Sequence, residues 1–110
     1  MTISESRQLL ITLSLAWVVW IHAEKSDLDL KRSKVSDWER VGKNVSYKTL
    51  EDCEKALTLQ ADTFEFYLKR RDPEAKRHGK VFVSHDDESL YAHEFSCLSD
   101  TVDPRGPKGK

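Results

Sequence analysis

Cysteine is scarce in this chain: only two occur among its 110 residues, and they do not form a C-x-x-C pair. The absence of that pair argues against thiol redox cycling. The sequence also lacks a glycine-rich phosphate loop, a G-x-S-x-G elbow and an H-E-x-x-H motif. No pattern therefore indicates phosphate binding, a nucleophilic serine or a zinc protease. We expect no enzymatic activity and no cofactor.

An excess of charge of one sign is also missing. Eighteen Lys and Arg residues oppose nineteen Asp and Glu residues, so the net charge is -1. Nucleic-acid-binding domains are usually strongly basic, and we therefore expect no nucleic-acid partner. The charges are nevertheless separated along the chain: residues 69–80 hold six Lys or Arg, whereas residues 81–100 hold five acids and no Lys or Arg.

An apolar run near the start has the features of a secretory signal peptide. Residues 9–21 carry no charge, follow a short start that contains Arg7, and precede the small residue Ala23. This pattern predicts that residues 1–23 are removed and that the mature chain begins at Glu24, in the periplasm or outside the cell. The alternative is an inner-membrane anchor in which residues 9–23 are retained, although about 20 apolar residues usually span a bilayer.

An exported chain enters an oxidising compartment, where two cysteines most simply form a disulfide. A bond between Cys53 and Cys97 would close a loop of about 45 residues and stabilise the fold by about 4 kcal/mol. Free thiols are the alternative.

The composition after the apolar run predicts three further segments. Residues 24–36 are polar and lack aromatics, so we expect a mobile leader or, as the alternative, a weak edge strand. Residues 37–99 form the folded domain, with a strand around residues 36–42 that contains Trp38. Residues 100–110 contain two prolines and five charged side chains, and we expect a disordered tail.

A long helix is predicted between Thr49 and the Asp72-Pro73 pair. Thr49 can cap its start, with Asp52 at the third helical position. The residue before a proline disfavours helical geometry and ends the element. At 100 degrees per residue, one broad stripe collects the apolar side chains: Leu50, Cys53, Ala56, Leu57, Ala61, Phe64, Tyr67 and Leu68.

Two segments rich in branched and aromatic residues follow the helix, "KVFVSH" and "LYAHEFSCLS", separated by the turn-like "DDES". They predict an antiparallel hairpin. Tyr91, His93, Phe95 and Cys97 would share one face of its second strand. The expected fold class is α+β, with one long helix packed on a short antiparallel sheet in the order β-α-β-β, and one disulfide.

Two kinds of residue could form an interaction surface. Leu59 and Phe66 lie seven residues apart on the helix face opposite the apolar stripe. Either the leader or a loop covers them, or they are tolerated at the surface, or they form a partner or self-association surface. A basic group flanks them and could meet a polyanion or anionic lipid, or could be a solvated face that pairs with the acidic hairpin: Lys69, Arg70, Arg71, Lys76, Arg77 and Lys80.

A metal site is a second candidate. The hairpin carries His85 and His93 among Asp86, Asp87 and Glu94, and imidazole and carboxylate ligands suit zinc or copper. The two histidines share a face only in one strand register, because a one-residue slip separates them. Solvated turn acids beside a half-buried His93 are the alternative.

The mature chain resembles a loosely defined group of small exported bacterial proteins that carry no assigned activity. The resemblance rests on "DWERVGKNVSYKTLEDCEKA", which holds Trp38 and Cys53, and on "CLSDTVDPRGPKGK", which holds Cys97 and an Asp-Pro-Arg tail. It implies a bacterial envelope setting and a bridge between Cys53 and Cys97.

These observations lead to one functional expectation and two alternatives. We expect a non-enzymatic, secreted or periplasmic protein that acts through contacts with a protein or an envelope surface. The first alternative is a periplasmic metal-binding protein that uses His85 and His93. The second is an accessory protein held in the membrane by its retained apolar segment.

Overall fold

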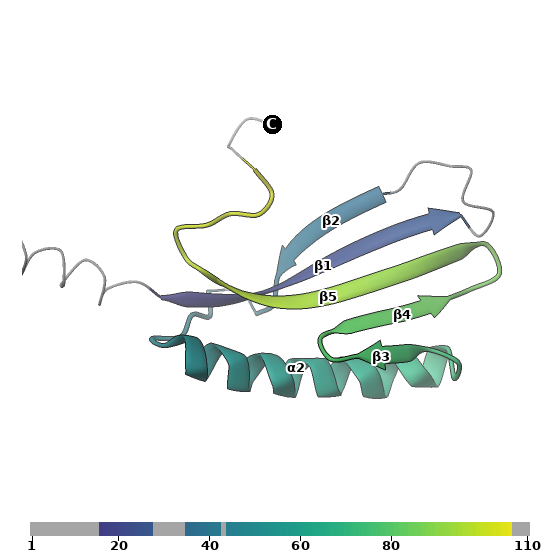
Figure 1. Cartoon of the computed structure of the whole chain (residues 1–110), viewed down its shortest axis with the longest axis horizontal. Helices are drawn as coiled ribbons and strands as arrows, with labels where there is room; N and C mark the ends of the chain where they lie inside the picture. Colours follow the sequence, from purple (N-terminus) through teal and green to yellow (C-terminus); the bar gives the residue numbers. More distant parts are fainter. Residues whose placement is uncertain (1–15, 28–34, 43, 107–110) are drawn as a thin grey trace, which may run out of the picture.

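A computed structural model of the chain describes residues 16–27, 35–42 and 44–106. One helix packs on one face of a five-stranded antiparallel sheet, as Figure 1 shows. The elements are β1 (Trp17–Asp27), β2 (Val35–Arg40), α2 (Leu50–Arg71), β3 (Lys76–His78), β4 (Val81–His85) and β5 (Ser89–Ser99). The strand order is β2-β1-β5-β4-β3.

The predicted α+β class, with one long helix, an antiparallel sheet and one disulfide, is confirmed. The predicted order β-α-β-β differs in detail, because two strands precede the helix and three follow it. The additional strands are β1, formed by residues assigned to the signal peptide and leader, and β3, formed inside the basic run. The expected strand around residues 36–42 corresponds to β2.

Strand β1 lies at the centre of the sheet. It pairs with β5 along its whole length, from Trp17 opposite Ser99 to Asp27 opposite Ser89, and with β2 on its other side. Val18, Val19 and Trp20 are each at most 3% exposed. Successive side chains of a strand point to opposite faces, so burial of three consecutive residues shows that both faces of β1 are covered.

This strand corrects the predicted boundaries at the start of the chain. The expected cleavage point after Ala23 and the last seven residues of the alternative anchor, residues 17–23, lie inside β1. The described residues of the segment 24–36 form strands in place of a mobile leader. Residues 24–27 belong to the central strand β1, and residues 35–36 belong to β2, which is an edge strand as the alternative expected. Residues 1–15 and 28–34 lie outside the described residues, and processing of the chain stays a prediction.

Helix α2 begins and ends where the sequence predicts. The Thr49 hydroxyl accepts a hydrogen bond from the Asp52 backbone N–H at 3.0 Å, and Asp72 is the C-terminal cap. Cys53, Leu57 and Ala61 are buried against the sheet, as the predicted stripe requires. Two predicted members are not part of the core, since Leu50 is 40% and Tyr67 58% exposed. Leu50 is the first residue of α2, and the Tyr67 ring contacts the exposed Phe66 ring.

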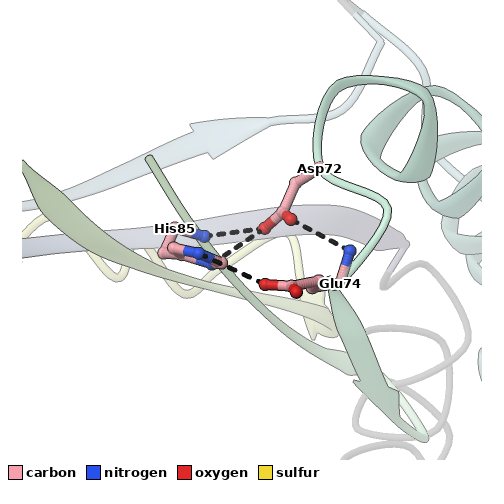
Figure 2. Close-up of side chains that lie close together, drawn as sticks. All are labelled: Asp72, Glu74 and His85. Carbon is pink, nitrogen blue, oxygen red and sulfur yellow. Dashed lines mark hydrogen bonds and ion pairs between the residues drawn. The ribbon is translucent and has the colours of Figure 1, made fainter. Parts of the chain in front are cut away.

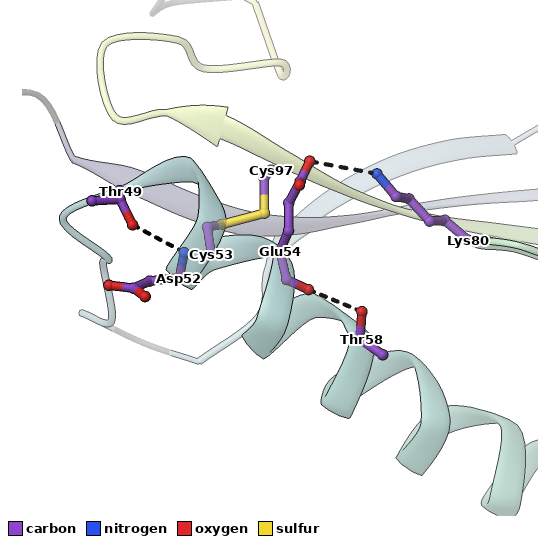
Figure 3. The surroundings of a disulfide bond; sticks show 7 residues. All are labelled: Thr49, Asp52, Cys53, Glu54, Thr58, Lys80 and Cys97. Carbon is purple, nitrogen blue, oxygen red and sulfur yellow. Dashed lines mark hydrogen bonds and ion pairs between the residues drawn. A yellow bond between two sulfur atoms is a disulfide. The ribbon is translucent and has the colours of Figure 1, made fainter.

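The core lies between α2 and the sheet. Val19, Phe82 and Phe95 project from three neighbouring strands, and the Phe64 ring meets the two phenylalanine rings edge-on at centroid distances of 5.1 and 5.5 Å. The predicted disulfide between Cys53 and Cys97 joins α2 to β5, which Figure 3 shows. A disulfide of this kind indicates an oxidising, non-cytoplasmic location.

The first residues of the tail are ordered, contrary to the expected disorder over residues 100–110. The Asp100 N–H donates to the Ala16 carbonyl at 2.8 Å, and a turn follows in which the Gly106 N–H donates to the Asp103 carbonyl. The Asp103 carboxylate accepts hydrogen bonds from the Arg105 side chain at 2.8 and 2.9 Å, and the Arg105 guanidinium lies 5.2 Å from the centre of the Trp20 ring. The Asp-Pro-Arg motif therefore covers Trp20 on the face of the sheet opposite α2. Residues 107–110 lie outside the described residues.

Removing residues 101–110 should lower the free energy of unfolding by about 2 kcal/mol, because a buried Trp20 would become exposed. Arg105→Ala should reproduce part of this loss. Lys48→Ala, at an exposed position before the helix, is the control and should have no effect. Urea unfolding followed by circular dichroism measures the change, and unchanged midpoints in both tail variants would contradict this account.

Candidate functional site

The outer face of α2 carries the first candidate site. Leu59 and Phe66 are 68% and 59% exposed, so no described segment covers them. The Phe66 ring contacts the Tyr67 ring edge-on at 5.3 Å, and the Arg70 guanidinium lies 5.7 Å from the centre of the Phe66 ring. A shallow hollow opens beside Phe66, lined by Asp62, Glu65, Phe66, Lys69 and Arg70.

The basic run does not form one uniform patch. The Arg77 side chain turns back to α2, where its Nη1 lies 2.8 Å from both Asp62 Oδ1 and Glu65 Oε1. Lys69 Nζ lies 3.1 Å from a Glu65 oxygen. Hydrogen bonds from Arg77 and Lys69 lower the pKa of Glu65, so this carboxylate is ionised at neutral pH. Arg77 and Lys69 are therefore paired within the fold.

The other basic residues of the predicted surface have different surroundings. Arg70, Arg71 and Lys76 form no ion pair with a carboxylate among the described residues. Arg70 lies on the outer face of α2 beside Phe66, and Arg71 lines a cavity at the end of the helix. Lys80 is 4.0 Å from Glu54. Among these predicted basic residues, the charges left unpaired in the described part of the chain are thus Arg70 and Arg71 in the last turn of α2 and Lys76 in β3.

A second candidate lies where α2 ends and meets β4. Asp72 is only 9% exposed. Its Oδ1 accepts a hydrogen bond from the Glu74 backbone N–H at 3.0 Å, and its Oδ2 accepts one from the His85 backbone N–H at 2.9 Å. The bond from His85 is the main cause of the lowered pKa of Asp72. This carboxylate is therefore ionised at neutral pH and connects the helix end to β4.

The His85 ring lies between two carboxylates, as Figure 2 shows. Its Nδ1 is 3.3 Å from Asp72 Oδ2, and its Nε2 is 3.6 Å from Glu74 Oε1. One donor atom from each of Asp72, Glu74 and His85 lies within 4.8 Å of the others. The sequence prediction included His85 but missed its two carboxylate neighbours. The available signal was a pair of acids two residues apart, directly after a helix.

The predicted partner of His85 lies elsewhere. His93 pairs with Phe82 across the hairpin, whereas His85 pairs with Leu90, and this register directs the two side chains to opposite faces of the sheet. The His93 ring packs against Phe64 at a centroid distance of 4.9 Å. Burial lowers the pKa of His93, and nearby Arg71 adds to the effect. His93 is therefore mainly neutral at neutral pH.

A cavity of about 230 Å³ lies beside the cluster. Both histidines line this cavity although their side chains point to different faces of the sheet. They can do so because His85 is the last residue of β4. The buried Nδ1 of His93 has no hydrogen-bond partner in the described part of the chain. The cavity is lined by Leu68, Arg71, Asp72, Ser84, His85, Asp86, Tyr91 and His93.

The acidic turn residue Asp86 shapes the hairpin. Its Oδ1 accepts hydrogen bonds from the Glu88 and Ser89 backbone N–H groups at 2.8 Å, and its Oδ2 accepts one from the Tyr91 hydroxyl at 2.7 Å. The bond from Tyr91 is the largest cause of the lowered pKa of Asp86. The hydrogen bonds that Asp86 accepts within the turn therefore explain why this position holds an acid.

No helix in residues 16–27, 35–42 and 44–106 has the length and apolarity needed to cross a membrane. Comparison of the chain with protein-family models, with curated proteins and with solved structures finds no match. The resemblance to small exported bacterial proteins stays an expectation that rests on its short motifs.

Proposed function

We propose that the protein is a small, non-enzymatic binding protein of the periplasm or the extracellular space. In this proposal it binds an acidic segment of another protein through the outer face of α2. The observation that carries the proposal is the exposure of Leu59 and Phe66, with Arg70 held over the Phe66 ring. The Cys53–Cys97 disulfide supports the oxidising location.

The side chains on this face are of the kinds that dominate protein interfaces. Phenylalanine, tyrosine and arginine are enriched there, and a few such residues usually supply most of the binding energy. Phe66 contacts both of its exposed neighbours, Tyr67 and Arg70. Contacts between these side chains reduce the conformational entropy that binding would otherwise cost.

The charge around Phe66 favours an acidic partner. Arg77 and Lys69 already neutralise Asp62 and Glu65. Arg70 and Arg71 are left without a carboxylate in the described residues. Their guanidinium groups can accept carboxylates in bidentate geometry.

A protein is favoured over an anionic membrane because acids lie on the same helix. Glu51 and Asp52 occupy its first turn, at the end of α2 opposite to Arg70. A helix that lies on an anionic bilayer usually presents Lys and Arg along its polar face. Acidic side chains along α2 would instead be repelled by the lipid headgroups.

Photocrosslinking in the source cells tests this proposal. A benzoylphenylalanine at position 66 should form an adduct with one protein, and mass spectrometry should place the crosslink in an acid-rich segment. Arg70→Glu should abolish the adduct by charge repulsion. The same photoreactive residue at Val83, exposed on β4 and facing away from α2, is the control and should give no such adduct. An adduct that survives Arg70→Glu, or crosslinking to lipid alone, would contradict the proposal.

Folding controls separate a lost contact from a lost fold. Leu59→Ser and Phe66→Ser should each change the free energy of unfolding by no more than about 0.5 kcal/mol, because both side chains are exposed. Leu57→Ala, two residues from Leu59 but buried, should cost about 2–5 kcal/mol. A large loss in the Leu59 or Phe66 variant would show that the residue belongs to the core.

A further inference from the structure

The cluster at the end of α2 combines two kinds of metal-binding donor in one place. Asp72 and Glu74 offer carboxylate oxygens, and His85 offers an imidazole nitrogen. The three donor atoms lie within 4.8 Å of one another. Ligand bonds to zinc are about 2.0–2.2 Å for these atoms, so donors at this separation reach a common ion after small side-chain rotations.

We infer that Asp72, Glu74 and His85 form a binding site for a divalent first-row transition-metal ion with the ligand preferences of zinc. Mixed imidazole and carboxylate ligands suit these ions, whereas calcium and magnesium prefer oxygen ligands alone. The site lies at the helix end, away from Leu59 on the outer face of α2, so the inference does not depend on the proposed partner.

The most buried donor is held in place before an ion arrives. Backbone N–H groups of Glu74 and His85 each donate to one oxygen of Asp72. Each carboxylate oxygen has a second lone pair that can bind a metal. Hydrogen bonds to a ligating carboxylate orient it and are a common feature of metal sites. Glu74 and His85 are exposed, which leaves a path for the ion to enter.

The cavity beside the cluster, which Asp72 and His85 also line, leaves room for water on a bound ion. Its volume of about 230 Å³ is far more than the roughly 30 Å³ share of one water molecule. Three protein donors leave at least one coordination position for water. The buried Nδ1 of His93 in the same cavity wall has no partner among the described residues, so the cavity also presents a free polar atom to water.

The charged residues around the cluster favour the binding of a cation. Arg71 and Asp86 both line the cavity and carry opposite charges. The two carboxylates of the cluster, Asp72 and Glu74, therefore determine the local sign. A divalent ion would neutralise this pair, which lies partly out of solvent because Asp72 is buried.

Calorimetric titration of the full, disulfide-bonded chain with zinc chloride tests the inference, and the visible spectrum of the cobalt(II) form reports the ligand geometry. We expect saturable binding of one ion per chain. His85→Ala and Glu74→Gln should each weaken binding by about tenfold or more. Asp72 is left intact because its hydrogen bonds hold the helix end. His78→Ala removes an exposed histidine from the neighbouring strand β3 and should leave the affinity unchanged.

Three outcomes would overturn the assignment. The first is no binding at millimolar zinc. The second is binding that survives both His85→Ala and Glu74→Gln, or that His78→Ala weakens equally, because the ion would then bind elsewhere. The third is a loss in His93→Ala as large as that in His85→Ala, because the ligand set would then include His93. Circular dichroism of each variant confirms that the fold is retained.

Discussion

A chain that begins at Glu24 should fail to form the native sheet, whereas a chain that begins at Ala16 should fold. The first truncation removes Trp17 and the six residues that follow it, which are most of the central strand β1. Strand β5 would then lose its main partner, because its pairing with β1 extends over both strands from end to end. Strand β2 would lose the neighbour that connects it to the sheet.

The energetic effect is large because the lost residues are core residues. Burying a Val or larger apolar side chain contributes about 1.5–3 kcal/mol. Loss of Val18, Val19 and Trp20, each at most 3% exposed, therefore removes about 6 kcal/mol. The total stability of a small domain is about 5–15 kcal/mol. The truncated chain should be unfolded or nearly so at room temperature.

Both truncated chains should be produced in an oxidising host and compared with the full chain by circular dichroism, thermal unfolding and amide NMR spectra. The Ala16 chain is the matched control, since it retains every described residue. Intact mass of the protein from its source provides a second test, and the mature N-terminus should lie at or before residue 16. A folded Glu24 chain with the native melting temperature, or a natural N-terminus at Glu24, would contradict the role of β1.

Loss of the disulfide should have the second largest effect. Cys53 is fully buried in α2, and Cys97 lies in β5, 44 residues later. Closing a loop of this length stabilises the folded state by about 4 kcal/mol on the chain-entropy model. Because the core of so short a chain is small, the bond should account for a large share of the total stability.

Urea unfolding with and without reductant measures this effect. The Cys53→Ala, Cys97→Ala double variant should match the reduced chain and should not respond to reductant, which separates the cross-link from the packing of the sulfur atoms. An exposed substitution such as Leu59→Ser should retain the full response to reductant. If reduction lowered the free energy of unfolding by less than about 1 kcal/mol, the bond would not be a main source of stability.

Local patterns predicted the elements that depend on neighbours in sequence. The hydroxyl of Thr49, the apolar stripe through Cys53 and the proline after Asp72 indicate α2 without reference to the rest of the chain. The hairpin of β4 and β5 follows in the same way from two β-rich segments and a polar turn. The pairing of Cys53 with Cys97 followed because only two cysteines exist.

The central strand β1 was not predicted, because its apolar pattern fits two different physical requirements. A strand covered on both faces needs apolar side chains at successive positions, and a signal peptide needs an apolar stretch of similar length. Residues 17–21 satisfy both requirements. The tail covers the face of β1 opposite α2, where Arg105 lies over Trp20. No local pattern connects two residues so distant in sequence.

The sequence alone determined the class of the fold, the limits of the helix and the cysteine pair, because helix caps, periodicity and composition act over short stretches of chain. Only the tertiary structure decided which charged side chains form ion pairs and which metal-binding side chains lie close together. Arg77 pairs with two acids of α2, and His85 meets Asp72 rather than His93. These contacts depend on how the helix end packs against β4 and on the register of the hairpin, which long-range packing sets.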